Sequence, residues 1–248
     1  MTNLSVNVNK VALLRNSRNT GVPDLIEFVN MAISSGADGI TVHPRPDQRH
    51  ATPDDVVDIL NFLKKNNHNV EFNIEGNPYH NLLSIVNQSP PTQCTFVPDS
   101  INTLTSNEGW NLNKEGSRLS PIVQELKQRD IRVSLFMDPN PNNIALAAEL
   151  GADRVELYTE PYAKAFSQGN PDTILDKYVQ CGNVAKQVGL GLNAGHDLSK
   201  ENLPLFLEKV ENVEEVSIGH AIIVDSLKEG FAETVRKYKT IISKAVNR

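Results

Sequence analysis

Two stretches of the sequence carry the same pattern, SSGADGI at residues 34–40 and ELGADRV at residues 149–155. In each stretch a helical pattern ends at a glycine, and an extended run of the kind found in strands follows at once. This pattern indicates a unit in which a helix leads into a strand. Because it occurs twice, more than 100 residues apart, it predicts a repeated arrangement of helices and strands.

The alternation extends across all 248 residues. Short runs rich in β-branched residues predict strands at 4–9, 39–43, 70–75, 93–98, 131–137, 153–159, 189–195 and 214–220. Helical patterns are predicted at 23–35, 53–66, 79–88, 116–129, 140–150, 171–188, 200–209 and 226–246. Pro23, Pro53 and Pro171 fit the first turns of three of these helices, and Thr52 and Asn170 are placed to cap two of them.

Eight strands in strict alternation with eight helices predict an α/β fold, a (β/α)8 TIM barrel formed as one domain over residues 1–248. A doubly wound open sheet is the alternative. That fold favours a glycine-rich turn after the first strand, whereas residues 7–16 contain no glycine. We expect extra structure in two places, an additional helix or lid within 99–120 and a short helix at 220–226.

Composition narrows the class of protein. The chain is 39% hydrophobic and 22% charged, which excludes a disordered, collagen-like or coiled-coil protein. Its net charge of -6 argues against a nucleic-acid or anionic-membrane partner. The sequence contains no long apolar run for a signal peptide or membrane span, so we expect a cytoplasmic protein. Cys94 and Cys181 are interpreted as buried free thiols.

In such barrels, chemistry is found at the carboxyl ends of the strands. Four histidines are predicted to lie there although they are far apart in the chain: His43, His50, His196 and His220. Histidine suits proton transfer near neutral pH. Five cations are predicted on the same face: Lys10, Arg15, Arg18, Arg45 and Arg49. This combination predicts a site for small molecules that carry one or two phosphate esters.

Other polar groups end the predicted strands. Glu75 closes the alternating run at 70–75, and a carboxylate enclosed by a barrel needs partners, which favours a functional role. Asn7 and Asn9 are predicted to point the same way from the first strand, toward a bound molecule. For Glu156, a functional and a structural role both remain open. Glycines end the last two strands, where backbone N–H groups can approach a phosphate without obstruction.

The residues by themselves leave several kinds of function open. The first is a metal-free enzyme for carbonyl–amine or enolisation chemistry on phosphorylated small molecules, with a Schiff-base aldolase that uses Lys10 as a variant. The second is a metal enzyme whose ligands are His43, Glu75, Asp138, His196 and His220. Neither HxH nor HExxH spacing is present, and the neighbouring cations would oppose a divalent metal. The third is a phosphate-binding scaffold without catalysis.

Several motifs together resemble the pyridoxine 5′-phosphate synthase family of the deoxyxylulose-dependent vitamin B6 pathway. They are VNVNKVALLRNSRNT (6–20), GADGITVHPRPDQRH (36–50), FNIEG (72–76), FVPD (96–99), TLTSNEGW (103–110), IRVSLFMD (131–138), GADRVELYTEPYA (151–163), LGLNAGHDL (190–198) and SIGHAII (217–223). The resemblance implies a transferase with a (β/α)8 barrel and additional helices, assembled as a homo-octamer of four dimers. It implies condensation of 3-amino-2-oxopropyl phosphate with 1-deoxy-D-xylulose 5-phosphate, to give pyridoxine 5′-phosphate, phosphate and water. No metal or organic cofactor is implied.

By position, the resemblance implies that His43 and Glu75 accept protons and that His196 donates one. It assigns binding of the amine substrate to Asn7, Arg18, Gly219 and His220. It places Asp197 beside a phosphate site as a substrate-binding residue that acts through its backbone N–H. It assigns binding of the deoxyxylulose phosphate to Asn9, Lys10, Arg45, His50 and Thr105. The chain departs from the family pattern at three places. Asn9-Lys10 stands where the family often has Asp-His, and Asp197 stands where it has Gly. Tyr158-Thr159-Glu160 stands where the family has His-Thr-Gly.

Overall fold

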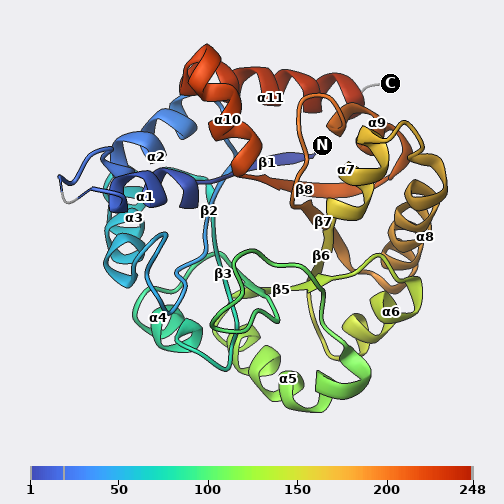
Figure 1. The fold of residues 1–248 in the computed structure, drawn as a ribbon. Coiled ribbons are helices and arrows are strands. Elements are labelled where there is room, and N and C mark those ends of the chain that lie inside the picture. Colours follow the sequence, from blue (N-terminus) through green and yellow to red (C-terminus); the bar gives the residue numbers. More distant parts are fainter. Residues whose placement is uncertain (1, 19, 247–248) are drawn as a thin grey trace.

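The computed structural model describes residues 2–18 and 20–246, so residues 1, 19, 247 and 248 of the predicted domain lie outside the described residues. Eight parallel strands form a closed barrel in which each strand pairs with its neighbours in sequence and β8 returns to β1 (Figure 1). The strands are β1 (Asn3–Asn7), β2 (Gly39–Val42), β3 (Glu71–Gly76), β4 (Gln93–Phe96), β5 (Arg132–Met137), β6 (Arg154–Tyr158), β7 (Gly191–Gly195) and β8 (Val213–Ile218). The predicted (β/α)8 barrel is therefore confirmed.

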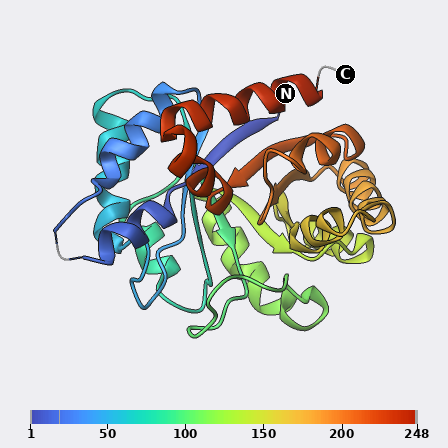
Figure 2. The same ribbon diagram turned by 45° about the horizontal axis from the view of Figure 1, so that its top comes forward.

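Helices surround the barrel on its outer side, as both ribbon views show (Figures 1 and 2). They are α1 (Asn9–Asn16), α2 (Leu25–Ser34), α3 (Pro53–Lys65), α4 (Leu82–Gln88), α5 (Leu112–Lys127), α6 (Pro141–Glu149), α7 (Glu160–Ser167), α8 (Asp172–Val188), α9 (Leu203–Lys209), α10 (His220–Glu229) and α11 (Phe231–Val246). None of the helices in the described part of the chain has the length and apolar character needed to cross a membrane.

The main differences from prediction are at helices. Helices α1 and α7 were not predicted, and the predicted helix at 226–246 is two helices that meet at Gly230, which has φ +81°. The predicted short helix at 220–226 is the first part of α10, whereas α5 is the only helix that the structure describes within 99–120. Thr52 caps α3 as predicted. Pro23 instead precedes the N-cap Asp24 of α2, and Pro171 occupies the cap position assigned to Asn170.

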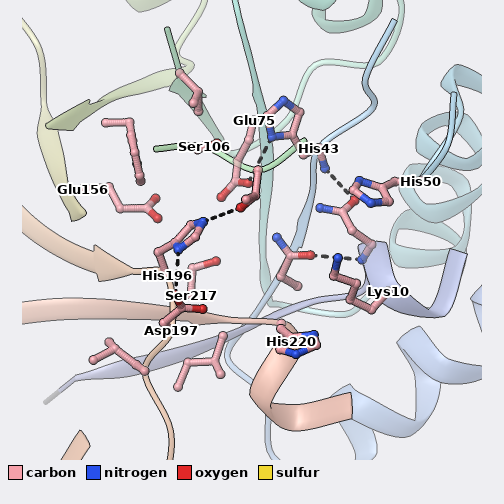
Figure 3. A pocket seen from close by; sticks show the side chains of 18 of the residues that line it. Lys10, His43, His50, Glu75, Ser106, Glu156, His196, Asp197, Ser217 and His220 are labelled. Carbon is pink, nitrogen blue, oxygen red and sulfur yellow. Dashed lines mark hydrogen bonds and ion pairs between the residues drawn. The ribbon is translucent and has the colours of Figure 1, made fainter. Parts of the chain in front are cut away.

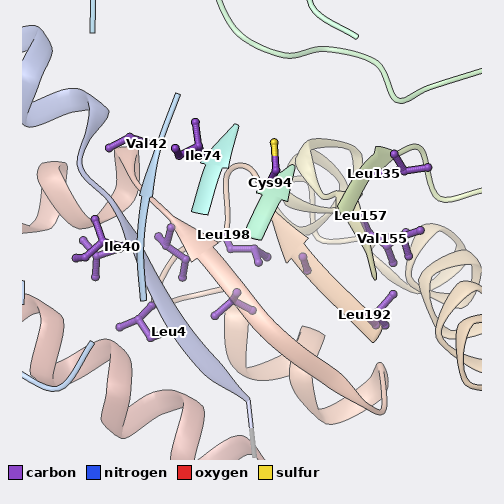
Figure 4. Packing of buried hydrophobic residues seen from close by; sticks show 14 of the residues in the cluster. Leu4, Ile40, Val42, Ile74, Cys94, Leu135, Val155, Leu157, Leu192 and Leu198 are labelled. Atoms are coloured by element: carbon purple, nitrogen blue, oxygen red, sulfur yellow. The ribbon is translucent and has the colours of Figure 1, made fainter. Parts of the chain in front are cut away.

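The outer faces of the strands form the main hydrophobic core against the helices. Figure 4 shows apolar side chains from many strands gathered in this layer, among them Leu4, Ile40 and Leu157, which are fully buried. Both cysteines are buried free thiols as predicted, and Cys94 belongs to this layer. Burial of this layer stabilises the barrel through the hydrophobic effect.

The inner face of the barrel is polar, unlike barrels filled with branched apolar side chains. Hydrogen bonds link Ser5 to Thr41, Thr41 to Asn73, and Asn73 to Thr95, across the first four strands. At the amino ends of β3 and β5, Arg132 donates two hydrogen bonds to a carboxylate oxygen of Glu71. Alternation between a polar interior and an apolar exterior therefore accounts for the period of two seen in the sequence.

The loop at residues 97–111, between β4 and α5, extends over the carboxyl end of the barrel. Its far end is attached to the sheet, because the Trp110 N–H donates to the Phe136 carbonyl and the indole N–H donates to the Phe96 carbonyl. Gly109 donates to the Asp138 carboxylate, and a Cβ at Gly109 would overlap the backbone at Met137 and Asp138. This close approach brings the middle of the loop over the strand ends.

Candidate active site

A cavity of about 340 Å³ opens at the carboxyl end of the barrel (Figure 3). All but one of the catalytic and substrate-binding residues that the family resemblance implies line it, and the exception is Arg18. The predicted residues in the lining are Asn7, Asn9, Lys10, His43, Arg45, His50, Glu75, Thr105, His196, Asp197, Gly219 and His220. The structure therefore brings together side chains that are up to 213 positions apart in the chain (7 to 220).

His43 and Glu75 form a buried pair of titratable groups on one wall of the cavity. His43 directly follows β2 and Glu75 lies on β3, so neighbouring strands bring the two side chains together. Nδ1 of His43 lies 3.8 Å from Oε2 of Glu75, and the side chains are 8% and 12% exposed. This separation is too long for a hydrogen bond but short enough for a small rearrangement to pass a proton between them.

Burial moves the two pKa values of this pair in opposite directions. It lowers the pKa of His43 well below the usual range, and the nearby Arg45 cation lowers it further. Burial raises the pKa of Glu75 to about 8, and the charge on Glu215 adds to that rise. At neutral pH the pair therefore consists of a neutral imidazole that can accept a proton and a carboxyl group that still holds one.

Glu156 on β6 is a further buried carboxylate in the cavity. Burial raises its pKa well above the usual range, and the charges of Glu75 and Glu215 raise it more. Its Oε2 is buried without a hydrogen bond, which leaves an acceptor or donor directed at the cavity. The sequence could not distinguish a functional from a structural role for Glu156. Alternation along the strand predicts that the side chain faces inward, but it does not predict whether hydrogen-bond partners surround it.

The turn after β1 differs from the predicted geometry. The Asn7 side chain accepts a hydrogen bond from the Asn9 N–H at 3.0 Å, which ends the strand and begins α1. Asn9 therefore lies in a helix rather than on the same strand face as Asn7, and its side chain accepts from the backbone N–H of His43 at 2.9 Å. Both asparagines and Lys10 still line the cavity.

Only part of the predicted cation cluster contributes to the cavity lining. Arg45 does so, and its guanidinium pairs with the Asp99 carboxylate at 2.6 Å. Arg15 points instead to Asp55 of α3, with which it forms a two-pronged ion pair. Arg49 donates to carbonyls of the 97–111 loop. Arg18 is exposed beyond the end of α1 and does not line the cavity in the described part of the chain.

His50 is held at the cavity by contacts to its backbone. The Asn16 side-chain amide lies within hydrogen-bond distance of three successive carbonyls, those of Gln48, Arg49 and His50, the last at 2.8 Å. Burial and the charge of Lys10 lower the pKa of His50 to about 4. His50 is therefore a neutral imidazole at pH 7, suited to hydrogen bonding rather than to charge pairing with an anion.

His196 lies on the opposite wall, directly after β7. Its Nε2 is 2.8 Å from the Thr105 hydroxyl of the 97–111 loop. The Tyr158 ring meets the His196 ring edge-on at 5.0 Å. Thr159 donates its hydroxyl to the carbonyls of Gly195 and His196, which fixes the backbone beneath the imidazole. The loop and two strands thus hold this side chain in one orientation.

Gly195 ends β7 as predicted, whereas β8 ends at Ile218 and Gly219 directly follows it. Of the two glycines, Gly219 lines the cavity. Gly219 is the N-cap of α10, and a Cβ there would lie 3.1 Å from Cβ of Asn7. A Cβ on Gly195 would overlap the Glu156 carboxylate. The first N–H groups of α10 have no partners within the helix, and the residues at its start, Gly219, His220 and Ala221, line the cavity. This arrangement can accept an anion.

A metal centre built from the five predicted ligands does not form. Asp138 accepts the Gly109 N–H and does not line the cavity. Among residues 2–18 and 20–246, no three His, Cys, Asp or Glu side chains are grouped as ligands for a metal ion. The predicted metal-ligand set therefore lacks the geometry that it needs.

Comparisons with known proteins identify the family of this chain. Residues 4–244 match the family described as pyridoxal phosphate biosynthesis protein PdxJ. The chain belongs to this family. A pyridoxine 5′-phosphate synthase of Albidiferax ferrireducens is 48% identical over 247 residues, which cover 98% of each chain. One from Xylella fastidiosa strain M12 is 48% identical over 97% of this chain and 95% of its own. The family resemblance predicted from the sequence, and with it an enzyme of vitamin B6 biosynthesis, is confirmed.

Solved structures of lower identity share the fold. The tryptophan synthase alpha subunit of Legionella pneumophila superposes with a TM-score of 0.64 at 11% identity, over 98% of this chain and 93% of its own. Phosphoribosyl anthranilate isomerase of Thermotoga maritima gives a TM-score of 0.63 at 12% identity, over 98% of this chain and 100% of its own. At these identities the likeness concerns the barrel alone.

Proposed function

We propose that this chain condenses 3-amino-2-oxopropyl phosphate with 1-deoxy-D-xylulose 5-phosphate in the cavity, and releases pyridoxine 5′-phosphate, phosphate and water. The observation that carries the proposal is the placement of His43, Glu75 and His196 around one cavity. Membership of the PdxJ family and the names of its relatives support the same reaction.

The roles follow from the protonation states of the three groups. Ring closure joins an amine to a carbonyl, eliminates water and phosphate, and ends with a deprotonation, so protons must be both removed and supplied. His43 is neutral at pH 7 and accepts the first proton. Glu75 is protonated at neutral pH and accepts a proton only after its own has left to the substrate or to water. His196 donates a proton to a leaving oxygen from the opposite wall.

Two phosphate groups need two binding regions. The start of α10, at Gly219 and His220, supplies backbone N–H groups for the phosphate of the amine substrate. Asp197 adds a backbone N–H, and Asn7 adds a side-chain amide. On the other side, Arg45 and Lys10 supply positive charge for the deoxyxylulose phosphate. Asn9, His50 and Thr105 supply neutral hydrogen-bonding groups to that substrate.

Arg18 belongs to this proposal in a different way, since it is exposed and away from the cavity within one chain. We keep it as a binding residue for the amine substrate. It would then act after a movement of the segment beyond α1 or within an assembly. A homo-octamer of four dimers in the cytoplasm, without a metal or organic cofactor, completes the proposal.

The purified protein, mixed with both phosphorylated substrates, tests the proposal. We expect pyridoxine 5′-phosphate and inorganic phosphate in equal amounts, and the same rate after dialysis against a chelator. Loss of activity that zinc restores would favour the metal enzyme instead. Substrate trapped on Lys10 by borohydride would indicate the aldolase mechanism, and binding of both substrates without product would indicate a scaffold. Size-exclusion chromatography with light scattering tests the octamer.

A further inference from the structure

The segment at His196 and Asp197 has an unusual backbone. The two residues have φ values of +86° and +59°, a region that residues other than glycine seldom adopt. Contacts on both sides maintain it. Thr159 donates to the His196 carbonyl, and the Asn202 side chain donates to the Asp197 carbonyl at 3.0 Å. Strained positions of this kind are often found at functional sites.

This backbone brings the two neighbouring side chains together. Oδ2 of Asp197 lies 3.5 Å from Nδ1 of His196. A dashed line joins the two side chains in Figure 3. Nδ1 is buried and has no hydrogen bond, while Nε2 on the other side of the ring is 2.8 Å from the Thr105 hydroxyl. The carboxylate is thus the ion-pair partner of a nitrogen that is otherwise unpaired. A small rotation of either side chain would close the remaining gap to a hydrogen bond.

We propose that Asp197 is a positioning residue for His196: its carboxylate holds a proton on Nδ1 and keeps the imidazole charged and ready to donate from Nε2. A carboxylate that orients a histidine in this way fixes its tautomer and stabilises the imidazolium. The inference rests on the proposed function, in which His196 supplies a proton. It gives the Asp197 side chain a role of its own, separate from substrate binding by its backbone.

The surroundings agree with a charged carboxylate at this position. Contact with the His196 ring lowers the pKa of Asp197, as does the charge of His220, although burial acts in the opposite direction. Other titratable groups near the pair are Glu156 and Tyr158 of β6 and His220 of α10. Glu160 of α7 and Asp138, which follows β5, act on Tyr158 behind the His196 ring. The Asp197 side chain is 43% exposed, so water screens the pair and its effect is moderate.

The test compares Asp197→Asn with wild type, because asparagine keeps the shape and tolerates the left-handed backbone. We expect kcat to fall about 2- to 10-fold, KM to change less than about 2-fold, and activity on the alkaline side to be lost at a lower pH. Asp197→Gly, which relieves the strain of the left-handed backbone, should show the same changes as Asp197→Asn. Glu160→Gln removes a nearby carboxylate outside the cavity lining and serves as the control for general charge effects.

Two further measurements separate the inference from its alternatives. In a His196→Gln background, Asp197→Asn should cause no additional loss, and in ¹⁵N spectra the Nδ1 signal of His196 should shift in Asp197→Asn. A lower KM with unchanged kcat would show that the carboxylate acts on substrate phosphate, and would overturn the inference. An unchanged pH profile and unchanged spectrum would also overturn it. Full activity in His196→Gln would instead contradict the proposed function.

Discussion

Nδ1 of His43 and Oε2 of Glu75 lie 3.8 Å apart at the carboxyl end of a barrel whose inner face is polar. Neither group has its usual protonation behaviour, since burial lowers the pKa of the imidazole and raises that of the carboxyl group. Opposite shifts allow a base and an acid to coexist at one pH. The His43 imidazole can therefore accept a proton while the Glu75 carboxyl group still holds its own.

Replacing Glu75 by glutamine should reduce turnover far more than substrate binding. The amide keeps the size of the side chain but can no longer exchange a proton with His43, so kcat should fall about 10²- to 10⁴-fold and KM should change little. Steady-state kinetics with both substrates measure this. Glu149→Gln, at the exposed end of α6, is the control and should keep wild-type kinetics. Wild-type turnover in Glu75→Gln would contradict the assignment.

The pH dependence of kcat/KM should report the same carboxyl group. Because the pKa of Glu75 is raised to about 8, its ionised form increases as the pH rises through 8. If Glu75 acts as a base in the free enzyme, kcat/KM should rise between pH 7 and 9 with a midpoint near 8. The Glu75→Gln variant should lack this rise. A flat wild-type profile over that range would contradict this role in the free enzyme.

Glu75 should also destabilise the fold at alkaline pH. Its pKa is about 8 in the folded chain and 4.5 when unperturbed, so the folded state binds the proton more tightly. The free energy of unfolding therefore falls progressively as the pH rises from 4.5 to 8. Glu75→Gln should match wild type near pH 4.5 and exceed it by about 1 to 3 kcal/mol at pH 9. Urea unfolding at several pH values measures this, and a constant difference would refute it.

The ion pair between Arg45 and Asp99 should hold the 97–111 loop. The side chains are 7% and 5% exposed, and Asp99 also accepts the Ser106 hydroxyl hydrogen bond. Asp99→Ala leaves a buried cation without its partner and should lower the free energy of unfolding by about 3 kcal/mol. It should also make the loop more sensitive to proteolysis near the exposed Leu104.

Asp47→Ala is the matched control for that variant, because the Asp47 carboxylate pairs with Arg49 but is 39% exposed. Its effect should be below about 1 kcal/mol. Equal losses in Asp47→Ala and Asp99→Ala would show that burial does not distinguish the two pairs. An Asp99→Ala protein with unchanged stability and an intact loop would contradict the prediction.

A methyl group at Gly195 should disrupt the cavity floor. Its Cβ would overlap the buried Glu156 carboxyl group, which would have to shift into the cavity that it lines, so Gly195→Ala should cost about 1 to 3 kcal/mol and lower the activity. Gly116→Ala provides the comparison, because a Cβ there meets Leu150 at 3.4 Å, an ordinary contact, within helix α5. That variant should retain activity and stability. Thermal unfolding and product release distinguish the two.

Local sequence patterns were sufficient to predict the barrel and most of the cavity lining. The period of two along the strands separates an apolar outer face from a polar inner face, and parallel strands place their carboxyl ends at one end of the barrel. Residues that directly follow a strand, such as His43 and His196, could therefore be assigned to the carboxyl end of the barrel from the sequence alone. The same logic could not find α1, because that helix begins at Asn9, inside the stretch 4–9 whose alternation predicts a strand.

Contacts between residues that are distant in the chain decide which cations are free to bind phosphate and how the site residues are protonated. Arg15 and Arg49 appeared free to bind phosphate, yet Asp55 and the carbonyl oxygen of Thr103 engage them in the folded chain. The protonation of His43 and Glu75 likewise depends on how many neighbours displace water from them. Periodicity reports which face a residue occupies, because it follows from backbone geometry. Charge pairing and desolvation follow from three-dimensional distances, and these exist only once the eight strands have closed the barrel.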